Sequence, residues 1–415
     1  MSDSSIVSRI VHETGRYAPD PLSGKPWWES LESNFWNRPE GFELGRWDNA
    51  RVRATAALDV VSRTLAASTI GLLAMPLGFH PFALQADLKD RTLYEDMALQ
   101  ADPSRFFPKP PRDVRVRAQK PQGPHFRPKD GTCADLSFES PFEPLNPRIR
   151  KKYLRHRWNA VARARYWRHE QRFKGKPRPT IVAVHGFAAD PYWLNEWFFA
   201  LPWFYQMGCD VFLYTLPFHG RRRTALSPFS GHGYFSGGLS WMNETIAQSV
   251  FDFRIFVNYL EDQAGVEKIG VTGVSLGGFT SALLAATEPR LYFSIPNVPV
   301  VSIPDLVLEW EPVGTAVRSA LFATGLSIKD IRKALAVAAP LTYKPLLPKE
   351  RLFIIGGVGD RLAPPSHSRL LWDHWGRCRI HWFPGNHVVH LDKGAYLKEM
   401  AKFLTEIKFL EEPRN

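Results

Sequence analysis

The 415-residue sequence predicts an α/β fold, with a mostly parallel central sheet flanked by helices and a helical N-terminal extension. From about residue 159 onward, short apolar runs alternate with longer stretches of helical periodicity, a pattern typical of βαβ units. Before residue 130 this alternation is absent. We therefore expect two parts, a helical extension with a proline-rich linker over 1–130 and an α/β domain over 131–415.

The predicted strands are short apolar or alternating runs, and the predicted helices carry apolar residues three to four positions apart. The strands cover 159–171, 180–184, 209–216, 268–274, 292–298, 351–357 and 379–383. The helices cover 192–205, 244–263, 277–287 and 391–409. Because reactive groups of such sheets gather at the carboxyl ends of the strands, the residues that follow each strand are the candidates for a site.

The extension contains a stretch, 64–86, without a single Asp, Glu, Lys or Arg. Its 23 residues could span a bilayer, but Pro76 and Pro81 interrupt any helix. We expect a helical hairpin that packs on the α/β domain or lies at a membrane surface, with a transmembrane helix as the alternative. Prolines cluster over 102–128, which predicts an extended linker.

The net charge of +12 is concentrated in one tract, 147–178, which holds thirteen Lys and Arg residues against one acid, Glu170. We interpret this tract as a solvated basic surface around an early strand or hairpin. The alternative is peripheral contact of 64–86 and 147–178 with an anionic membrane. Nucleic-acid binding is not expected, because no nucleic-acid module accompanies the tract.

The cysteines Cys133, Cys209 and Cys378 show neither paired nor metal-ligand spacing. The sequence opens with polar residues and no apolar signal segment. Both observations favour a reducing compartment and a cytoplasmic location, with membrane association as the alternative. Neither a cofactor nor a metal is expected, since no phosphate-binding loop, dinucleotide fingerprint or metal-ligand cluster occurs.

The strongest motif is G-x-S-x-G at Gly273, Ser275 and Gly277, between a predicted strand and a predicted helix. A tight turn at this junction strains the serine backbone and lifts its hydroxyl above the sheet, and small neighbours prevent collisions. Ser275 is therefore the candidate nucleophile, and the N–H of Leu276 faces a developing oxyanion. The alternative is a small-residue turn with an idle serine.

A second motif, His185-Gly186-Phe187, ends the strand predicted over 180–184. In this position the backbone N–H of Phe187 can supply the second oxyanion donor. We expect His185 itself to act as a structural hydrogen-bonding residue rather than as a base.

Two further residues complete a predicted triad. Asp360 follows the strand 351–357 and can accept a hydrogen bond from an imidazole. His387 follows the last strand, on a loop that can reach the serine. Asp305 competes for the role of the acid, and His390 for that of the base.

Residues 159–409 resemble the α/β-hydrolase superfamily through the motifs HGF, GVSLG, GVGD and GNH. The segment 217–221 (PFHGR) and the long extension look like the branch that contains alpha/beta hydrolase domain-containing protein 18. The resemblance implies hydrolysis of esters, thioesters, amides or lipids through an acyl-enzyme. The segments 221–241 and 300–335 interrupt the rhythm of strands and helices, and either could form a lid.

We therefore predict a serine hydrolase that cleaves a carboxylic ester or related acyl bond of a small molecule or lipid, as an esterase, lipase or thioesterase does. A peptidase or amidase, and a non-catalytic scaffold with the same fold, are the alternatives. We expect Arg221, Arg222 and Arg223 to be solvated loop residues, with binding of an acidic group of the substrate as the alternative. A further set of aromatic residues could line an apolar acyl pocket, although core packing is the expected role of each. They are Trp193, Trp197, Phe198, Phe199, Phe229, Tyr234, Phe235 and Trp241.

Overall fold

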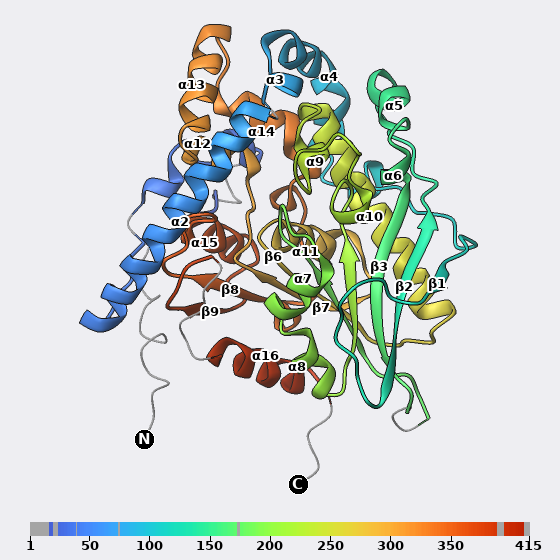
Figure 1. Ribbon diagram of the computed structural model, residues 1–415. Coiled ribbons are helices and arrows are strands. Elements are labelled where there is room, and N and C mark those ends of the chain that lie inside the picture. Colours follow the sequence, from blue (N-terminus) through green and yellow to red (C-terminus); the bar gives the residue numbers. More distant parts are fainter. Residues whose placement is uncertain are drawn as a thin grey trace.

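The computed structural model describes residues 16–19, 24–38, 40–73, 75–171, 175–387 and 394–410. Within them, nine strands form one sheet in the order β1-β2-β3-β5-β4-β6-β7-β8-β9, and helices lie on both of its faces (Figure 1). The strands are β1 (Arg117–Gln119), β2 (Gly131–Glu139), β3 (Val161–His169), β4 (Thr180–Val184), β5 (Asp210–Thr215), β6 (Ile269–Val274), β7 (Leu291–Asn297), β8 (Phe353–Gly357) and β9 (Arg379–Phe383).

The helices differ widely in length, and the two longest, α2 and α10, belong to the extension and to the α/β domain respectively. The bounds are α1 (Trp27–Ser30), α2 (Arg46–Leu73), α3 (Met75–Gly78), α4 (Pro81–Leu99), α5 (Pro147–Tyr153), α6 (Arg157–Ala160), α7 (Tyr192–Phe198), α8 (Leu201–Gln206), α9 (His232–Phe235), α10 (Leu239–Asp262), α11 (Leu276–Thr287), α12 (Ile303–Glu309), α13 (Val313–Thr324), α14 (Ile328–Leu335), α15 (Pro365–His374) and α16 (Ala395–Glu406).

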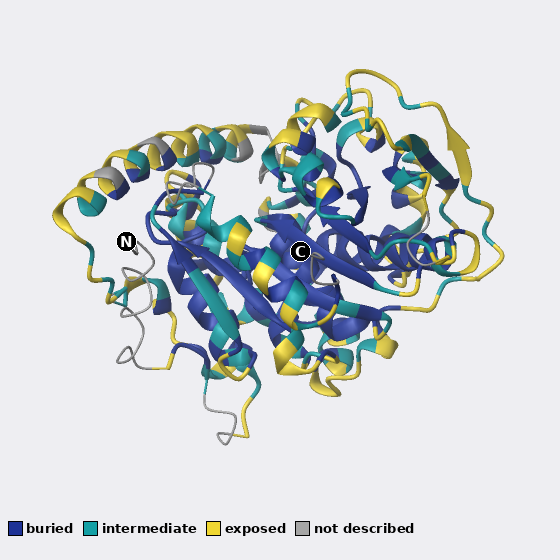
Figure 2. Cartoon of the chain, turned by 90° about the horizontal axis from the view of Figure 1, so that it is seen from below, coloured by how far each residue is buried: buried dark blue, intermediate teal, exposed yellow. Residues whose placement is uncertain are grey.

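The sheet is parallel from β5 to β9, whereas β1, β2 and β3 run antiparallel along one edge. Every residue of β4, β5 and β6 is buried, because helices cover both faces of these central strands (Figure 2). Their apolar sequences reflect this double burial. The α/β fold with a mostly parallel sheet is thus confirmed, and so are the strands predicted over 180–184, 209–216 and 268–274.

Three details of the prediction are wrong. The sheet gains β1 and β2, which the sequence analysis did not predict, and β1 lies inside the predicted linker. The helix predicted over 192–205 is divided into α7 and α8, because Ala200 adopts a left-handed backbone conformation with φ of 50°. The basic tract is partly internal, since the fully buried Arg165 on β3 forms ion pairs with Asp135 at 2.6 Å and Glu196 at 3.1 Å.

The N-terminal extension is helical, as predicted, and packs on the α/β domain. Helix α4 contacts α10 and α14, and α2 contacts α13 along one side of the molecule (Figure 1). The predicted linker also packs: Phe107 is buried, and Arg254 of α10 donates a hydrogen bond to its carbonyl oxygen at 2.6 Å. None of the helices in the described ranges is both long and apolar enough to cross a membrane.

Candidate active site

Ser275 stands at a sharp turn between β6 and α11, with φ of 59° and ψ of −113°. A residue with a side chain pays strain energy for such a conformation, on the order of 1–3 kcal/mol. The turn has no room for larger neighbours, because a Cβ atom at Gly277 would overlap the carbonyl oxygen of Val184, and one at Gly273 would overlap that of Gly277. This arrangement is the strained junction that the G-x-S-x-G motif predicts.

The two candidate oxyanion donors, Phe187 and Leu276, lie beside this serine. Leu276 is the first residue of α11, so its N–H has no partner within the helix. Among the hydrogen bonds of the described residues, neither of these two N–H groups is used. The loop after β4 passes close to the turn, since a Cβ atom at Gly186 would lie 3.5 Å from the Cβ of Ser275.

Asp360 and His387 form a buried pair at the same edge of the sheet. The Oδ2 atom of Asp360 lies 2.7 Å from Nδ1 of His387, and its Oδ1 atom accepts hydrogen bonds from the backbone N–H groups of Leu362 and Ala363. Burial disfavours the charged imidazole, but the charge and hydrogen bond of Asp360 outweigh this effect and raise the pKa of His387. With Nδ1 donating to Asp360, Nε2 can accept a proton.

Backbone hydrogen bonds hold the turns of neighbouring strands together. Ser275 N donates to the carbonyl oxygen of Asn297 at 3.0 Å, and Gly359 N donates to that of Gly385 at 2.7 Å. No hydrogen bond between the Ser275 hydroxyl and His387 occurs among those of the described residues. In unliganded enzymes this contact often tightens only when the substrate binds.

The other described aspartate and histidine candidates from the sequence do not take part in this acid–base pair. Asp305 accepts hydrogen bonds from Arg332 at 3.0 and 2.5 Å, and both side chains are fully buried, so Asp305 forms a structural ion pair between α12 and α14. Burial lowers the pKa of His185 to about 4, and its Nε2 accepts a hydrogen bond from Leu216 N at 3.0 Å. His390 lies outside the described residues.

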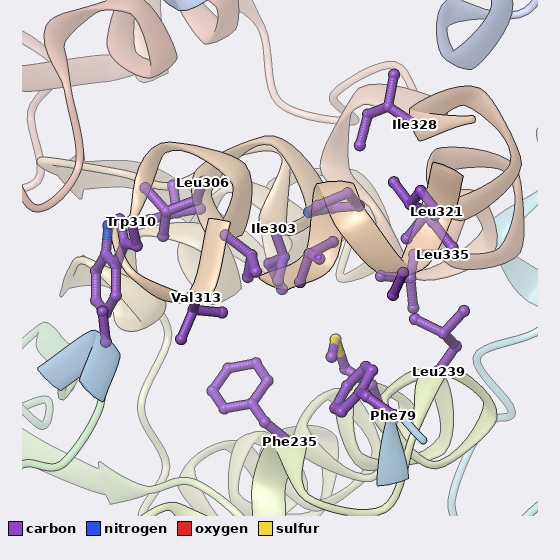
Figure 3. A pocket seen from close by; sticks show the side chains of 18 of the residues that line it. Phe79, Phe235, Leu239, Ile303, Leu306, Trp310, Val313, Leu321, Ile328 and Leu335 are labelled. Carbon is purple, nitrogen blue, oxygen red and sulfur yellow. The ribbon is translucent and has the colours of Figure 1, made fainter. Parts of the chain in front are cut away.

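An apolar cavity of about 170 Å³ opens at Ser275. Helices α12, α13 and α14 form one wall, and Phe79, Phe235 and Leu239 form the opposite wall (Figure 3). Among the side chains of the lining, only the Ser275 hydroxyl and the indole of Trp310 carry a polar group, and that indole donates to Leu362 O. The lining consists of Ala67, Phe79, Leu84, Phe187, Phe235, Leu239, Met242, Ser275, Leu276, Val300, Ile303, Pro304, Leu306, Val307, Trp310, Val313, Val317, Ala320, Leu321, Ile328, Ile331 and Leu335.

The segment predicted as a lid over 300–335 therefore supplies much of the cavity wall. Of the eight aromatic candidates, only Phe235 lines the cavity; Tyr234 and Trp241 pack in the core as expected, and Trp197 is 75% exposed. Arg222 fits neither interpretation of the loop arginines, since it is not solvated and cannot reach a substrate. Its guanidinium is fully buried and forms an ion pair with Asp252 at 2.6 Å.

The contribution of the extension to this site was not predicted from the sequence. Helix α2 carries Asp59, a buried carboxylate that accepts a hydrogen bond from His387 N at 2.9 Å. The available signal was that Asp59 is the only acidic residue between 49 and 86. In the part of the chain that the structure describes, no three His, Cys, Asp or Glu side chains could hold a metal ion.

Comparisons with known proteins agree with this architecture. Residues 179–292 match a family model described as the alpha/beta hydrolase fold. Acetyl xylan esterase 1 from Thermoanaerobacterium sp. JW/SL YS485 aligns with a TM-score of 0.52 and 16% identity over 77% of this chain and 94% of its own. The acetyl xylan esterase from Paenibacillus sp. R4 aligns with a TM-score of 0.51 and 12% identity over 82% of this chain and 98% of its own.

A relative is also found by sequence. The uncharacterized protein Rv2627c of Mycobacterium tuberculosis H37Rv is 28% identical over 327 residues, which cover 75% of this chain and 72% of that protein. The family match and the two structural alignments, together with the strand order described above, show that the chain has the α/β-hydrolase fold.

Proposed function

From the α/β-hydrolase fold of this chain, we propose that it is a serine hydrolase that cleaves a carboxylic ester or a related acyl bond through an acyl-enzyme. Ser275 is the nucleophile, His387 the general base and Asp360 the acid. The backbone N–H groups of Phe187 and Leu276 form the oxyanion hole.

One observation carries this proposal. The strained turn at Ser275 borders the apolar cavity together with Phe187 and Leu276, whose N–H groups are not used by other hydrogen bonds of the described residues. An idle serine would not need a strained backbone, and unused N–H groups beside a cavity are costly unless a ligand accepts their hydrogen bonds. Both features fit a tetrahedral intermediate.

The reaction proceeds in two halves. His387 Nε2 removes the proton of the Ser275 hydroxyl as its oxygen attacks the carbonyl carbon, and the tetrahedral oxyanion receives two N–H hydrogen bonds. As the acyl–oxygen bond breaks, the imidazolium protonates the leaving group. His387 then activates water, which attacks the acyl-enzyme and releases the carboxylic acid. Asp360 stabilises the imidazolium in both halves.

The cavity supports an apolar acyl group as the substrate moiety. Its lining offers no charged side chain and almost no polar atom beyond the Ser275 hydroxyl. A peptide would leave its buried N–H and C=O groups unsatisfied there, at a cost of about 1–3 kcal/mol each. The hydrocarbon chain of an ester or thioester has no hydrogen bonds with water to lose on entry, so this class of substrate is favoured over peptides.

The proposal is tested by labelling the purified protein with a fluorophosphonate probe, alongside the Ser275→Ala variant. We expect the wild type to label and the variant not to label, while circular dichroism shows both to be folded. Wild-type protein that is folded but does not label would refute the serine mechanism and would favour a scaffold role.

We also propose that the acyl substrate comes from a lipid surface. Five large apolar side chains near the cavity are more than half exposed, and Phe82 and Phe322 reach 81% and 91%. They belong to α2, α3, α4 and α13, and the basic helix α5 lies at the same end of the molecule (Figure 1). Exposed apolar groups flanked by lysines bind anionic membranes. The five residues, here called the apolar rim, are Leu65, Leu72, Leu77, Phe82 and Phe322.

Two finer points are part of the proposal. We place the enzyme in the cytoplasm, because Cys133, Cys209 and Cys378 are all free thiols, as expected in a reducing compartment. We further assign it to the branch that contains alpha/beta hydrolase domain-containing protein 18, on the basis of the segment 217–221 and the long extension.

A further inference from the structure

Helix α2 of the N-terminal extension lies directly against the loops that carry the proposed acid and base. The side chain of Val52 packs on the backbone of Gly359. The two are so close that a Cβ atom on Gly359 would lie 2.9 Å from Cγ1 of Val52. One turn later, the carbonyl oxygen of Thr55 accepts a hydrogen bond from Nδ2 of Asn386 at 2.9 Å. The next position on this face of the helix is Asp59.

Asp59 connects both loops through a single oxygen atom. Its Oδ2 accepts hydrogen bonds from His387 N at 2.9 Å and from Arg361 N at 3.1 Å, and the residue is 1% exposed. Arg63, one turn further along α2, donates to the carbonyl oxygen of Arg361 at 3.1 Å. Residues three and four apart share one face of a helix, so α2 holds the two loops along four consecutive contact positions.

From these contacts we infer that Asp59 is a positioning residue of the active site, which keeps His387 and Asp360 in register and adds a second negative charge behind the imidazole. This inference rests on the proposed function of Ser275, Asp360 and His387. It makes the extension part of the catalytic apparatus, although no residue of α2 touches the reacting atoms in this scheme.

The charges around His387 make the inference testable. The carboxylates of Asp360 and Asp59 both raise the pKa of His387. The two arginines nearby are engaged elsewhere, since Arg361 forms an ion pair with Glu40 at 2.7 Å and Arg63 binds a carbonyl oxygen. Loss of the Asp59 charge should therefore lower the pKa of His387.

The same charge is unfavourable for stability. Burial and the charge of Asp360 raise the pKa of Asp59 above 3.8. A group whose pKa is raised in the folded state contributes stability only while it is protonated, and this contribution is lost as the pH rises through the folded pKa. Above this folded pKa the ionised Asp59 thus opposes folding, and a neutral isostere should not lower the melting temperature there.

The experiment compares fluorophosphonate labelling rates of the full-length wild type, Asp59→Asn and Ser275→Ala between pH 5 and 9 (about the range over which histidines titrate). For Asp59→Asn we expect a labelling rate lower by on the order of 10- to 100-fold, a pH midpoint below that of the wild type, and an unchanged or higher melting temperature. The matched control, Asp96→Asn, changes an exposed carboxylate of α4 and should behave as wild type.

Three results would overturn the inference, and they are distinguishable. If the wild type does not label, the proposed function fails. If the wild type labels but Asp59→Asn matches it in rate and midpoint, only the role of Asp59 fails. If Asp59→Asn loses labelling and melting temperature together with an unchanged midpoint, its role is merely structural.

A second variant covers the case in which Asp59→Asn does not fold. Asn386→Ala removes the neighbouring hydrogen bond to Thr55 O but no charge. We expect it to label more slowly than the wild type at an unchanged pH midpoint, because the histidine loop is displaced while no charge near His387 is lost. A wild-type rate for this variant would refute the clamping of that loop by α2.

Discussion

The Nδ1 atom of His387 lies 2.7 Å from the Oδ2 atom of Asp360, across the turns that follow the neighbouring strands β8 and β9. Asp360 is fully buried and its second oxygen is occupied by two backbone N–H groups, so the carboxylate has one orientation. This geometry selects the imidazole tautomer that leaves Nε2 free to accept a proton.

The role of the nucleophile is tested by Ser275→Ala. Without the hydroxyl, no acyl-enzyme forms, and we expect the rate of ester hydrolysis to fall by roughly 10,000-fold or more. Turnover of a chromogenic ester measures the effect. Ser319→Ala, at an exposed position of α13, is the control and should retain wild-type turnover. Activity that survives in the Ser275 variant would place the chemistry at another residue.

Asp360→Asn tests the acid. The amide cannot stabilise the imidazolium and favours the wrong imidazole tautomer, so kcat should fall by about 1,000- to 10,000-fold while KM changes little. Steady-state kinetics with the same ester distinguish the two parameters. An equally large loss in Asp305→Asn at unchanged folding, with normal kcat in the Asp360 variant, would reverse the assignment of the two aspartates.

The pH dependence of kcat/KM reports His387, which must be neutral to act as a base. Because the charge of Asp360 raises the pKa of His387 above 6.5, activity should rise with pH through a midpoint above 6.5. Stability depends on pH in the opposite direction. The ion pair between protonated His387 and Asp360 stabilises the fold fully below pH 6.5, and this stabilisation is lost as the pH rises through the folded pKa of His387. The substrate must be an ester without a titrating group, so that the pH profile reports the enzyme alone. A midpoint below 6.5 would contradict the pairing.

Acyl-chain selectivity tests the cavity. Val317 lies on the cavity wall, and Val317→Trp should fill part of the space. Each methylene that loses its apolar contact costs about 0.8 kcal/mol, so the variant should lose kcat/KM for long-chain esters while retaining it for acetate. Ser319→Trp, two positions along the same helix and exposed, controls for an added tryptophan. Equal losses for all chain lengths would indicate that the acyl group binds elsewhere.

Membrane contact through the apolar rim is tested by flotation with vesicles that contain anionic lipid. The double variant Phe82→Ser/Phe322→Ser removes two side chains that are 81% and 91% exposed, so folding should be retained and vesicle binding reduced. Ser275→Ala serves as the parent protein, which separates binding from hydrolysis.

The control for the rim is Trp47→Ser. Trp47 is 82% exposed in the first turn of α2 and lies about 38 Å along the helix from Leu72. We expect this variant to bind vesicles as the parent does. Unchanged flotation of the double variant would show that the apolar rim does not bind the membrane. Equal binding to neutral and anionic vesicles would show that the basic helix α5 does not contribute.

The central strands and the serine turn could be predicted because their signals are local. A run such as 180–184 must be a buried strand, and Gly273 and Gly277 must be small because backbone atoms approach them closely. The positions of Asp360 and His387 followed from the same logic, since each comes directly after a strand of the sheet. Chain order then grouped them with Ser275 at one edge.

The lining of the cavity could not be predicted in this way. Trp197 and Phe235 have the same apolar character in the sequence, yet one is 75% exposed and the other lines the cavity. The difference depends on how α12, α13 and α14 pack over the turn at Ser275, and no local pattern contains this packing. Arg222 was misjudged for a similar reason, because its ion-pair partner Asp252 is distant in the sequence.

The sequence by itself therefore determined the α/β fold, the strained serine and the candidate acid and base, because short-range sterics and the periodicity of strands and helices constrain these features residue by residue. Only the tertiary structure decided that the extension enters the site. The hydrogen bond from His387 N to Asp59 joins residues 328 positions apart. Such a contact depends on the packing of a whole helix against two loops, and its energy exists only once the chain has folded.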